Sequence, residues 1–343
     1  MEQIVGEGKA IIKVASEKKI SKKLPVFYNP VMKLNRDISV LLLNSVSDKD
    51  LQIALPLAGS GIRGLRFLLE LKNNKIKTLY INDYKEDFYN TIRENFKLNK
   101  LPSTDIILSN DDANLFILNN SGFDYIDIDP FGSPNPFLDS AITRLSRNGI
   151  LAVTATDTSA LSGTFENACR RKYWAKPLRN ELKHEVGIRI LIRKVQLVAA
   201  QYEKALVPIL SYSKEHYFRV FFRCEKGKTK VDEVLKKHEF FHTAGPMWTG
   251  FLHDKKLVKK MLKNSDGEAK KLLTILSEEL DTIGFYDIHQ ICEDIKKTVP
   301  KYDVLMKKIT NRGFSVSRTH FSGFGIRSNI EKEELLVLIR QLV

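Results

Sequence analysis

The feature that most constrains the fold of this chain is an alternation of strand-like and helix-like segments that ends in two strands joined by a short link. Five apolar strand candidates alternate with helix candidates, and they are Leu51–Leu57, Thr78–Ile81, Asp105–Leu108, Phe123–Ile128 and Ile150–Ala155. Such alternation predicts a parallel sheet with helices on both faces. Only residues 213–216 separate the next two strand candidates, Ala205–Tyr212 and Tyr217–Phe222, and so short a link permits antiparallel pairing alone.

A parallel α/β sheet completed by an antiparallel hairpin is the layout of the Rossmann-like class I methyltransferase fold, whereas plain dinucleotide-binding folds lack the hairpin. We therefore expect an α/β methyltransferase domain over residues 51–225. Residues 1–50 are expected to be an N-terminal extension packed on this domain, irregular up to residue 30 and helical after it. A charged, glycine-containing stretch at residues 226–230 predicts a linker, and residues 231–343 are expected to form a smaller C-terminal α/β domain.

Length, charge and cysteine content narrow the possible functions. The 343 residues suit two domains, and the net charge of +14 predicts a polyanionic partner such as nucleic acid. The three distant cysteines, Cys169, Cys224 and Cys292, exclude a disulfide framework or a four-cysteine zinc site built from this chain alone. Because the N-terminal residues do not resemble a signal peptide and no run of about 18 apolar residues occurs, we expect a cytoplasmic protein without membrane contact.

A glycine-rich segment, Gly59-Ser60-Gly61-Ile62-Arg63-Gly64, directly follows the first strand candidate and precedes a helix. Its G-x-G-x-x-G spacing allows a tight turn and close approach of the backbone to a nucleotide-like cofactor. Asp83 ends the next strand candidate, where a carboxylate can accept hydrogen bonds from both ribose hydroxyls. Asp111 or Asp112 could accept from an adenine amine, although a helix N-cap explains either residue equally well. NAD and S-adenosylmethionine both fit these residues.

The segment Asp127-Ile128-Asp129-Pro130-Phe131-Gly132-Ser133-Pro134 closes the fourth strand candidate, and its Asp-Pro-Phe resembles the D/N-P-P-F/Y signature of enzymes that methylate planar amine nitrogens. The lone pair of the guanine exocyclic amine is delocalised into the ring, so the amine is a poor nucleophile. Hydrogen bonds from its two N–H groups to the Asp129 carboxylate and the Pro130 carbonyl would favour localisation of that pair on nitrogen. Asp129 is also suited to accept the proton, and Phe131 offers a stacking face. A plain strand-to-helix turn would leave this clustering unexplained.

The chain resembles the tRNA guanine-26 N2-dimethyltransferases, in a short, archaeal-like form. The matching segments extend over most of the chain, and they are Glu7–Lys9, Val26–Asp37, Ser60–Gly64, Asp127–Pro134, Ala155–Thr158, Arg171–Tyr173, Lys176–Arg179, His184–Glu185, Arg189, Gly245–Gly250 and Val316–Phe321. The resemblance implies S-adenosylmethionine as the cofactor and tRNA as the partner. The reaction it implies is mono- and dimethylation of the exocyclic N2 amine of guanine 26, carried out by a monomer.

The same resemblance implies roles for individual residues. The residues it assigns to the cofactor are Arg36, Arg63 or Arg66, Asp83 and Asp112, with Ala113 beside them. It makes Phe27 and Phe131 the residues on which the target base stacks, and Asp129 the group that accepts the proton. Many relatives carry paired, zinc-binding cysteines before the Gly-Pro-Met-Trp segment. This chain has only Cys224 near that position, so no zinc and no other metal site are expected.

Clustered basic residues indicate where RNA would be held. Arg170-Arg171-Lys172-Tyr173-Trp174 mixes charge with aromatic side chains, and Arg179–Lys194 is also rich in basic residues. Phosphate contacts from such clusters give affinity without sequence information. We expect the C-terminal domain to measure tRNA shape from outside the active site.

Three other functions stay open at this point. A protein glutamine methyltransferase would share a similar Asp-Pro loop, but the basic composition, the second domain and the single proline after Asp129 argue against it. An NAD-dependent dehydrogenase would share the glycine-rich turn, yet it has no use for the Asp-Pro-Phe segment or the final hairpin. An inert RNA-binding protein on a methyltransferase scaffold is disfavoured by the intact Asp129 and glycines, and is not excluded by them.

Overall fold

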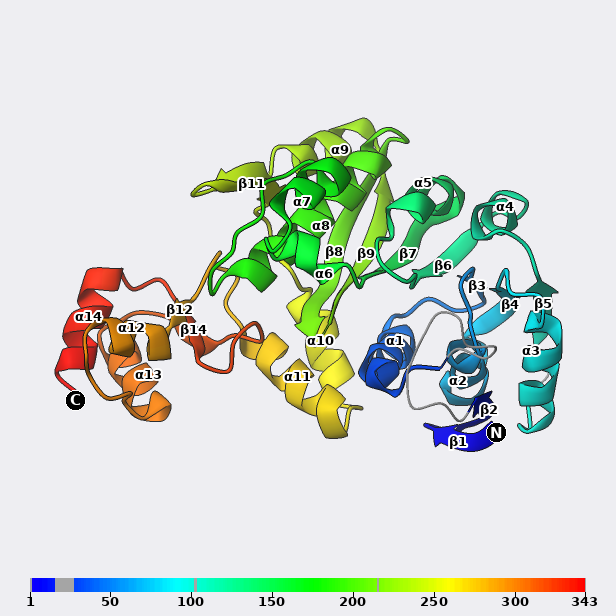
Figure 1. Cartoon of the computed structure of the whole chain (residues 1–343), viewed down its shortest axis with the longest axis horizontal. Coiled ribbons are helices and arrows are strands. Elements are labelled where there is room, and N and C mark those ends of the chain that lie inside the picture. Colours follow the sequence, from blue (N-terminus) through cyan, green and yellow to red (C-terminus); the bar gives the residue numbers. More distant parts are fainter. Residues whose placement is uncertain (1, 16–27, 102–103, 215, 343) are drawn as a thin grey trace.

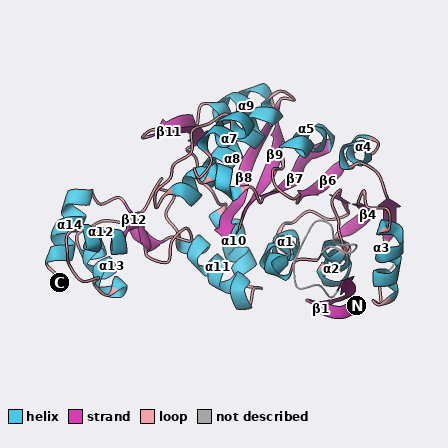
Figure 2. Ribbon diagram, in the orientation of Figure 1, coloured by secondary structure: helices cyan, strands magenta, loops and turns pink. Residues whose placement is uncertain are grey.

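The computed structural model describes residues 2–15, 28–101, 104–214 and 216–342. Its centre is a seven-stranded sheet in the order β5–β4–β3–β6–β7–β9–β8 (Figures 1 and 2). The strands are β3 (Leu51–Leu55), β4 (Ile76–Asn82), β5 (Asp105–Ser109), β6 (Phe123–Ile128), β7 (Leu145–Ala155), β8 (Lys204–Lys214) and β9 (Tyr217–Lys226). Strands β3 to β7 are parallel, and β9 pairs antiparallel with both β7 and β8. The predicted parallel sheet with a final hairpin is confirmed.

Helices cover both faces of this sheet because neighbouring side chains of a strand point to opposite sides. Leu151 and Val153 of β7 belong to one apolar core, and Ile150 and Ala152 belong to the other. The first core is completed by α4 (Ala113–Leu118), α5 (Asn135–Arg144), α6 (Thr158–Leu161), α7 (Glu166–Tyr173) and α8 (Lys183–Ala200). The second is completed by α1 (Lys33–Ser45), α2 (Ile62–Glu70), α3 (Phe88–Lys97), α10 (Lys255–Leu262) and α11 (Gly267–Glu278).

The N-terminal segment is more regular than the sequence analysis predicts. Residues 2–15 form an antiparallel hairpin of β1 (Glu2–Glu7) and β2 (Ala10–Ala15), and a short 3₁₀ helix, Pro30–Met32, leads into α1. The expectation of irregular backbone is therefore wrong for the hairpin. Ala10, Ile12 and Val14 alternate along β2 and pack on Ile62 and Leu65 of α2, which places the hairpin against the glycine-rich segment.

The linker predicted at residues 226–230 is also wrong. Strand β9 continues to Lys226, and α9 (Lys228–Leu235) begins two residues later. Val231 and Val234 of α9 pack in the same core as α8, as do residues of β11 (Ala244–Trp248), which pairs with β10 (His238–Phe241). The apolar face of α9 thus extends the sheet domain beyond the point where the charged stretch suggested a boundary.

A separate, smaller core occupies the C-terminal end of the chain. It holds the three-stranded sheet β12–β14–β13 (Tyr286–Asp287, Gly325–Ser328, Val316–Arg318) and the helices α12 (Ile288–Asp294), α13 (Tyr302–Asn311) and α14 (Lys332–Arg340). Figure 1 shows these elements, coloured orange to red, to one side of the large sheet. Among the described helices, none is long and apolar enough to cross a membrane.

Candidate active site

A cavity of about 590 Å³ lies where the parallel strands β3, β4 and β6 end. Ligand pockets typically enclose about 300–1,000 Å³, so the cavity can hold a nucleoside-sized cofactor. The predicted residues that it brings together are Arg36, Gly59, Arg63, Asp83, Asp129, Pro130 and Phe131. Those that do not line it are Gly61, Arg66, Asp111, Asp112 and Ala113. Phe27 lies outside the described residues.

The glycine-rich turn forms the floor of the cavity and needs its glycines. Gly59 and Gly61 have φ angles of 55° and 78°, in the left-handed region that L side chains rarely adopt. A Cβ atom at Gly61 would lie 2.0 Å from the Ile92 side chain. The amide of Gly59 donates to Asp83 Oδ2 at 2.7 Å, so the turn and the end of β4 are held together. Gly61 therefore shapes the turn without facing the cavity.

Asp83 lies with its carboxylate in the cavity wall. Its Oδ1 accepts from the Lys85 amide at 3.2 Å, and Asn110 anchors the loop by donating to the backbone oxygens of Asp83 and Lys85. Tyr84, with 69 % of its surface exposed, follows Asp83 and also lines the cavity. Tyr84 is not among the residues predicted from the sequence, although an aromatic residue directly after a strand-end acid is a recognisable signal for a stacking surface.

The two candidate acids after β5 are separated by the structure. Asp112 is the N-cap of α4, and its Oδ1 accepts from the amides of Asn114 and Leu115 at 2.9 and 3.3 Å. Ala113 is the buried first residue of that helix. Asp111 is exposed, and its amide donates to Asn82 Oδ1. The helix-cap interpretation therefore holds for Asp112.

The three candidate arginines have different surroundings. Arg36 lines the cavity but forms a two-pronged ion pair with Glu7 at 2.7 and 2.6 Å. Arg66 does not line the cavity and pairs with Glu7, Asp37 and Glu70. Arg63 faces the loop after β6, residues 129–134, and its Nη2 lies 2.5 Å from Asp129 Oδ2. Apart from Glu70, these partners are distant in sequence, which is why the chain alone did not distinguish the three.

The loop after β6 is anchored at Gly132 and Ser133. The Gly132 amide donates to Thr156 Oγ1 at 2.6 Å, and the Thr156 amide donates to the Gly132 carbonyl at 2.9 Å. The Ser133 hydroxyl lies 3.0 Å from the Tyr173 hydroxyl, which donates to Asp157 at 2.6 Å. Phe131, directly before these anchors, keeps 55 % of its surface exposed, so its ring can offer a face to a base.

A fully buried charged pair lies beneath the loop. Asp127 accepts two hydrogen bonds from Arg219 of β9, at 2.9 and 2.7 Å, and one from the Tyr125 hydroxyl at 2.6 Å. Burial alone would raise the pKa of Asp127, but Arg219 and Arg63 outweigh it and hold this pKa below its usual value. Asp127 is therefore ionised throughout the neutral range and serves the packing of the site.

The helical basic cluster predicted to bind RNA is only partly available. In α8, Arg189 and Lys194 are buried, at 1 % and 6 % exposure, and Lys194 Nζ lies 3.0 Å from the centroid of the Trp174 ring. The prediction is wrong for these two residues, because helical periodicity turns them toward the core. Arg170 and Arg171 of α7 are exposed, as is Trp174, and so remain suited to contact an anionic partner.

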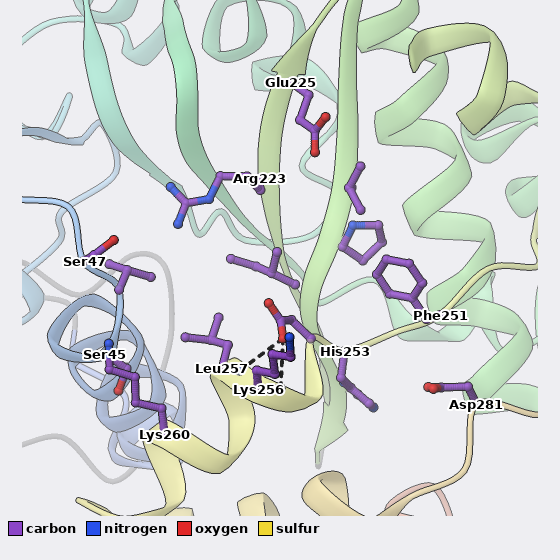
Figure 3. A pocket seen from close by; sticks show the side chains of 15 residues that line it. Ser45, Ser47, Arg223, Glu225, Phe251, His253, Lys256, Leu257, Lys260 and Asp281 are labelled. Atoms are coloured by element: carbon purple, nitrogen blue, oxygen red, sulfur yellow. Dashed lines mark hydrogen bonds between the residues drawn. The ribbon is translucent and has the colours of Figure 1, made fainter. Parts of the chain in front are cut away.

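A second cavity of about 670 Å³ lies between the end of α1, strands β8 and β9, and α10 (Figure 3). Its basic residues are Arg223, Lys256 and Lys260, and its acidic residues are Glu225, Asp254 and Asp281. The Asp254 carboxylate caps α10, and Arg223 pairs with Asp48. The charges balance and none of the predicted catalytic residues is present, so this cavity lacks the chemistry of the first.

A further buried group, here termed the junction cluster, consists of Glu185, Arg189, His253, Glu279, His320 and Arg327. Arg327 bridges Glu185 and Glu279 at 3.0 and 2.9 Å, and so ties α8 to the C-terminal sheet. Among the described residues, His253, Glu279 and His320 are the three whose ligand atoms could reach one metal ion. Because two carboxylates already balance two arginines here, a divalent cation would bring uncompensated charge into the core.

Fold and site together define a class of protein. The sheet is of the class I α/β type and ends in an antiparallel hairpin. One cavity combines a glycine-rich turn, a strand-end acid and the Asp-Pro-Phe segment. This combination defines an S-adenosylmethionine-dependent methyltransferase. A dehydrogenase would leave the Asp-Pro-Phe segment without a role.

Comparison with known proteins identifies the family. A model described as "N2,N2-dimethylguanosine tRNA methyltransferase" matches residues 8–241 and 238–340, and the chain belongs to this family. It is 39 % identical to tRNA (guanine(26)-N(2)/guanine(27)-N(2))-dimethyltransferase of Aquifex aeolicus, over 99 % of this chain and 96 % of that protein. It is 38 % identical to tRNA (guanine(26)-N(2))-dimethyltransferase of Methanobrevibacter smithii, over 98 % and 97 %. The structure of Trm1 from Pyrococcus horikoshii with S-adenosyl-L-methionine superposes with a TM-score of 0.88 at 38 % identity, covering 98 % and 99 % of the two chains.

Proposed function

We propose that this protein transfers methyl groups from S-adenosylmethionine to the exocyclic N2 amine of guanine 26 in tRNA, first one and then a second. The observation that carries the proposal is the Asp129-Pro130-Phe131 segment in the wall of a cofactor-sized cavity. Full-length similarity to relatives that carry the name tRNA (guanine(26)-N(2))-dimethyltransferase supports it.

The cavity fits the proposed cofactor by its donors and acceptors as well as by its volume. The Gly59 turn lets the backbone approach a ligand closely, and the Asp83 carboxylate is placed to accept from ribose hydroxyls. Tyr84 supplies an aromatic face beside that acid. When bound, S-adenosylmethionine would supply an electrophilic methyl group. Asp111 and Asp112 do not line the cavity, and Asp112 is occupied as a cap, so neither enters this assignment.

In the proposed reaction, Asp129 and Pro130 act on the amine and Phe131 on the ring. The carboxylate of Asp129 and the carbonyl of Pro130 accept hydrogen bonds from the two amine N–H groups, which makes the nitrogen lone pair available. As the N–C bond forms, the methyl group would separate from the cofactor's sulfur, leaving S-adenosylhomocysteine, and one proton of the amine would pass to Asp129. Phe131 stacks on the purine and thereby orients it. The stacking role of Phe27 stays a prediction.

The tRNA itself would be held by charge and by shape. A guanine in a stacked position must leave the stack to reach Asp129, and phosphate contacts from exposed basic residues such as Arg171 would offset part of that cost. That the C-terminal domain measures tRNA shape stays a prediction, as do the monomeric state and the cytoplasmic location. Because α9, α10 and α11 belong to the cores of the sheet domain, the test deletes only residues 286–343, which hold the separate C-terminal core. Unchanged tRNA binding after this deletion would contradict the first of these predictions.

Methyl transfer to unmodified tRNA tests the proposal directly. The wild type and Asp129→Ala are incubated with labelled S-adenosylmethionine and tRNA transcripts, and the labelled nucleosides are identified after digestion. We expect N2-methylguanosine and N2,N2-dimethylguanosine from the wild type and almost none from the variant. A transcript in which guanine 26 is replaced by adenine is the matched substrate control. If tRNA binds without acquiring label, the protein is an inert RNA-binding scaffold and the proposal fails.

A further inference from the structure

Four charged side chains form a line from the core of the sheet to the cavity, here termed the pocket ionic chain. It consists of Arg219, Asp127, Arg63 and Asp129, in that order. The successive nitrogen–oxygen distances are 2.7, 3.3 and 2.5 Å. The exposure of the side chains rises along the line, from 0 % for Arg219 and 1 % for Asp127 to 9 % for Arg63 and 19 % for Asp129.

Arg63 is the member that joins the buried pair to the loop after β6. Nη1 donates to Ser39 Oγ at 2.9 Å and faces Asp127 at 3.3 Å. Nη2 donates to Asn35 Oδ1 at 2.9 Å as well as to Asp129. Hydrogen bonds thus use three of the four hydrogens on the terminal nitrogens, and the Asp127 carboxylate lies beside the nitrogen that carries the fourth. The carboxylate of a cofactor would have to compete with Asp127 and Asp129 for Arg63.

The charges along the line show which residue depends on Arg63. Asp127 keeps Arg219 as a two-pronged partner whether or not Arg63 is present. Asp129, by contrast, has Arg63 as its cationic partner among the described residues. The Arg63 contact involves Oδ2, and within the described part of the chain no hydrogen bond to Oδ1 occurs. Arg63 thereby fixes one oxygen of a carboxylate that lines the cavity, and Oδ1 accepts no hydrogen bond from the described residues.

We infer that Arg63 is a positioning residue for Asp129 and not an anchor for the cofactor. It orients the carboxylate, with Oδ1 available to the amine, and Asn35, Ser39 and Asp127 hold Arg63 in turn. A charge-assisted contact of this kind is short and directional. The inference rests on the proposed function, because it assigns to Asp129 the role of accepting from the guanine amine.

The test separates cofactor binding from turnover. Arg63→Gln and Arg63→Lys are compared with the wild type for kcat at saturating S-adenosylmethionine and tRNA, and for the calorimetric Kd of S-adenosylhomocysteine, which carries the same amino-acid carboxylate. We expect Arg63→Gln to lower kcat on the order of 100-fold, the cost of a misplaced catalytic group, and to leave Kd within about threefold. Arg63→Lys restores part of kcat because it returns a cation beside Asp129.

Two further variants control for the possibility that Arg63→Gln lowers kcat because the protein no longer folds. Arg223→Gln removes an arginine from an ion pair with Asp48, outside the cavity, and should change neither kcat nor Kd. Asn35→Ala removes one partner that holds Arg63 and should lower kcat in the same direction by a smaller factor. If Arg63→Gln melts at the same temperature as the wild type, it is folded and its kinetics can be interpreted. If it does not, the kcat and Kd of Asn35→Ala are used to test the inference instead.

Either of two results overturns the inference. A Kd raised tenfold or more in Arg63→Gln, with kcat retained at saturating cofactor, would make Arg63 the anchor of the cofactor carboxylate. An unchanged kcat would show that Asp129 needs no cation beside it. Failure of the proposed function looks different, because the wild type would then bind S-adenosylhomocysteine but transfer no methyl group to tRNA.

Discussion

The pocket ionic chain and the junction cluster are built from the same kinds of side chain but end in different surroundings. In the pocket ionic chain the last carboxylate, Asp129, has 19 % of its side chain exposed to the cavity. In the junction cluster the side chains of Glu185, Arg189, Glu279 and Arg327 are only 1–2 % exposed. The difference teaches that ionic contacts alone do not mark an active site. A charge that is buried on all sides stabilises the packing, whereas a charge with one open side can act on a substrate.

The largest expected effect comes from the open end of the pocket ionic chain. Asp129→Asn keeps the shape of the side chain but removes the charge that, in the proposed reaction, accepts the amine proton. Loss of a general base typically costs about 10²–10⁴-fold in rate, and we expect kcat to fall by that amount with little change in melting temperature. Single-turnover methylation assays and thermal melts measure the two quantities. A large loss of stability with little loss of kcat would show that Asp129 stabilises the fold and does not act on the substrate.

A substitution in the junction cluster should show the opposite result, a loss of stability without a loss of cofactor binding. Arg327→Met leaves Glu185 and Glu279 buried without their shared cation, and breaking a buried pair in this way costs about 3–5 kcal/mol of unfolding free energy. Urea denaturation measures the loss, and the Kd of S-adenosylhomocysteine should stay unchanged. The double variant Glu279→Gln with Arg327→Met removes one of the stranded charges and should recover part of the stability. No recovery would show that the arginine contributes through packing rather than charge.

Lowering the pH should reduce the free energy of unfolding through His253 of the junction cluster. Burial lowers the pKa of His253 from 6.5 to about 4, even though Glu279 lies beside it. Between pH 6.5 and pH 4 the unfolded chain therefore binds a proton that the folded chain does not, and stability present above pH 6.5 is lost as the pH falls. The shift of 6.5 minus 4 corresponds to a loss of at most about 3 kcal/mol.

Urea denaturation between pH 7 and pH 4.5 measures this loss, and His253→Asn should make the pH dependence shallower. The matched control is His238→Asn, because burial also lowers the pKa of His238 to about 4, away from the junction cluster. The two variants should each remove part of the slope independently. An unchanged slope in His253→Asn would show that the buried imidazole does not govern acid sensitivity.

The smallest effect concerns Asp112, for which the family resemblance and the structure suggest different roles. As the N-cap of α4, it should contribute about 1 kcal/mol to stability, and Asp112→Ala should lose that amount. The Kd of S-adenosylhomocysteine should stay within about threefold, since Asp112 does not line the cavity. Asp112→Asn, which retains a capping oxygen, is the control. A tenfold rise in Kd for both variants would return Asp112 to the cofactor site.

The sequence predicts those parts of the fold that follow from local patterns. The strands, the glycine-rich turn and the Asp-Pro-Phe loop are each encoded within a dozen residues, and the structure has them in the predicted order. The N-terminal hairpin was missed because Ala10, Ile12 and Val14, which form its buried face, do not alternate with polar residues alone: Ile11 is apolar and exposed. The linker error has the reverse cause, because a lysine-rich stretch concealed the apolar face of α9 at Val231 and Val234.

The partners of the charged residues were beyond sequence reasoning. Arg63 and Arg66 lie on the same helix, and the one local difference is Glu70, which stands four residues after Arg66 and pairs with it. The carboxylates that place Arg63 at the cavity, Asp127 and Asp129, are distant in sequence. Asp127 and Arg219 are 92 residues apart, and Glu185 and Arg327 are 142 apart. Pairs at such separations are determined by the register of the sheet and by the packing of the C-terminal domain. They can therefore be identified only once the fold is known.

The position of β9 has a consequence for synthesis of the chain on the ribosome. Although β8 is made first, β9 lies between it and β7, and Arg219 of β9 donates to Ser39, 180 residues earlier. Until about residue 226 has left the ribosome, the edge of β7 that later pairs with β9 is therefore unpaired. Asp127 likewise lacks its ion-pair partner Arg219 during this time. The nascent chain is most exposed to wrong pairing in this interval. A pause in translation just before β9 should consequently lower the yield of folded protein more than one placed after it.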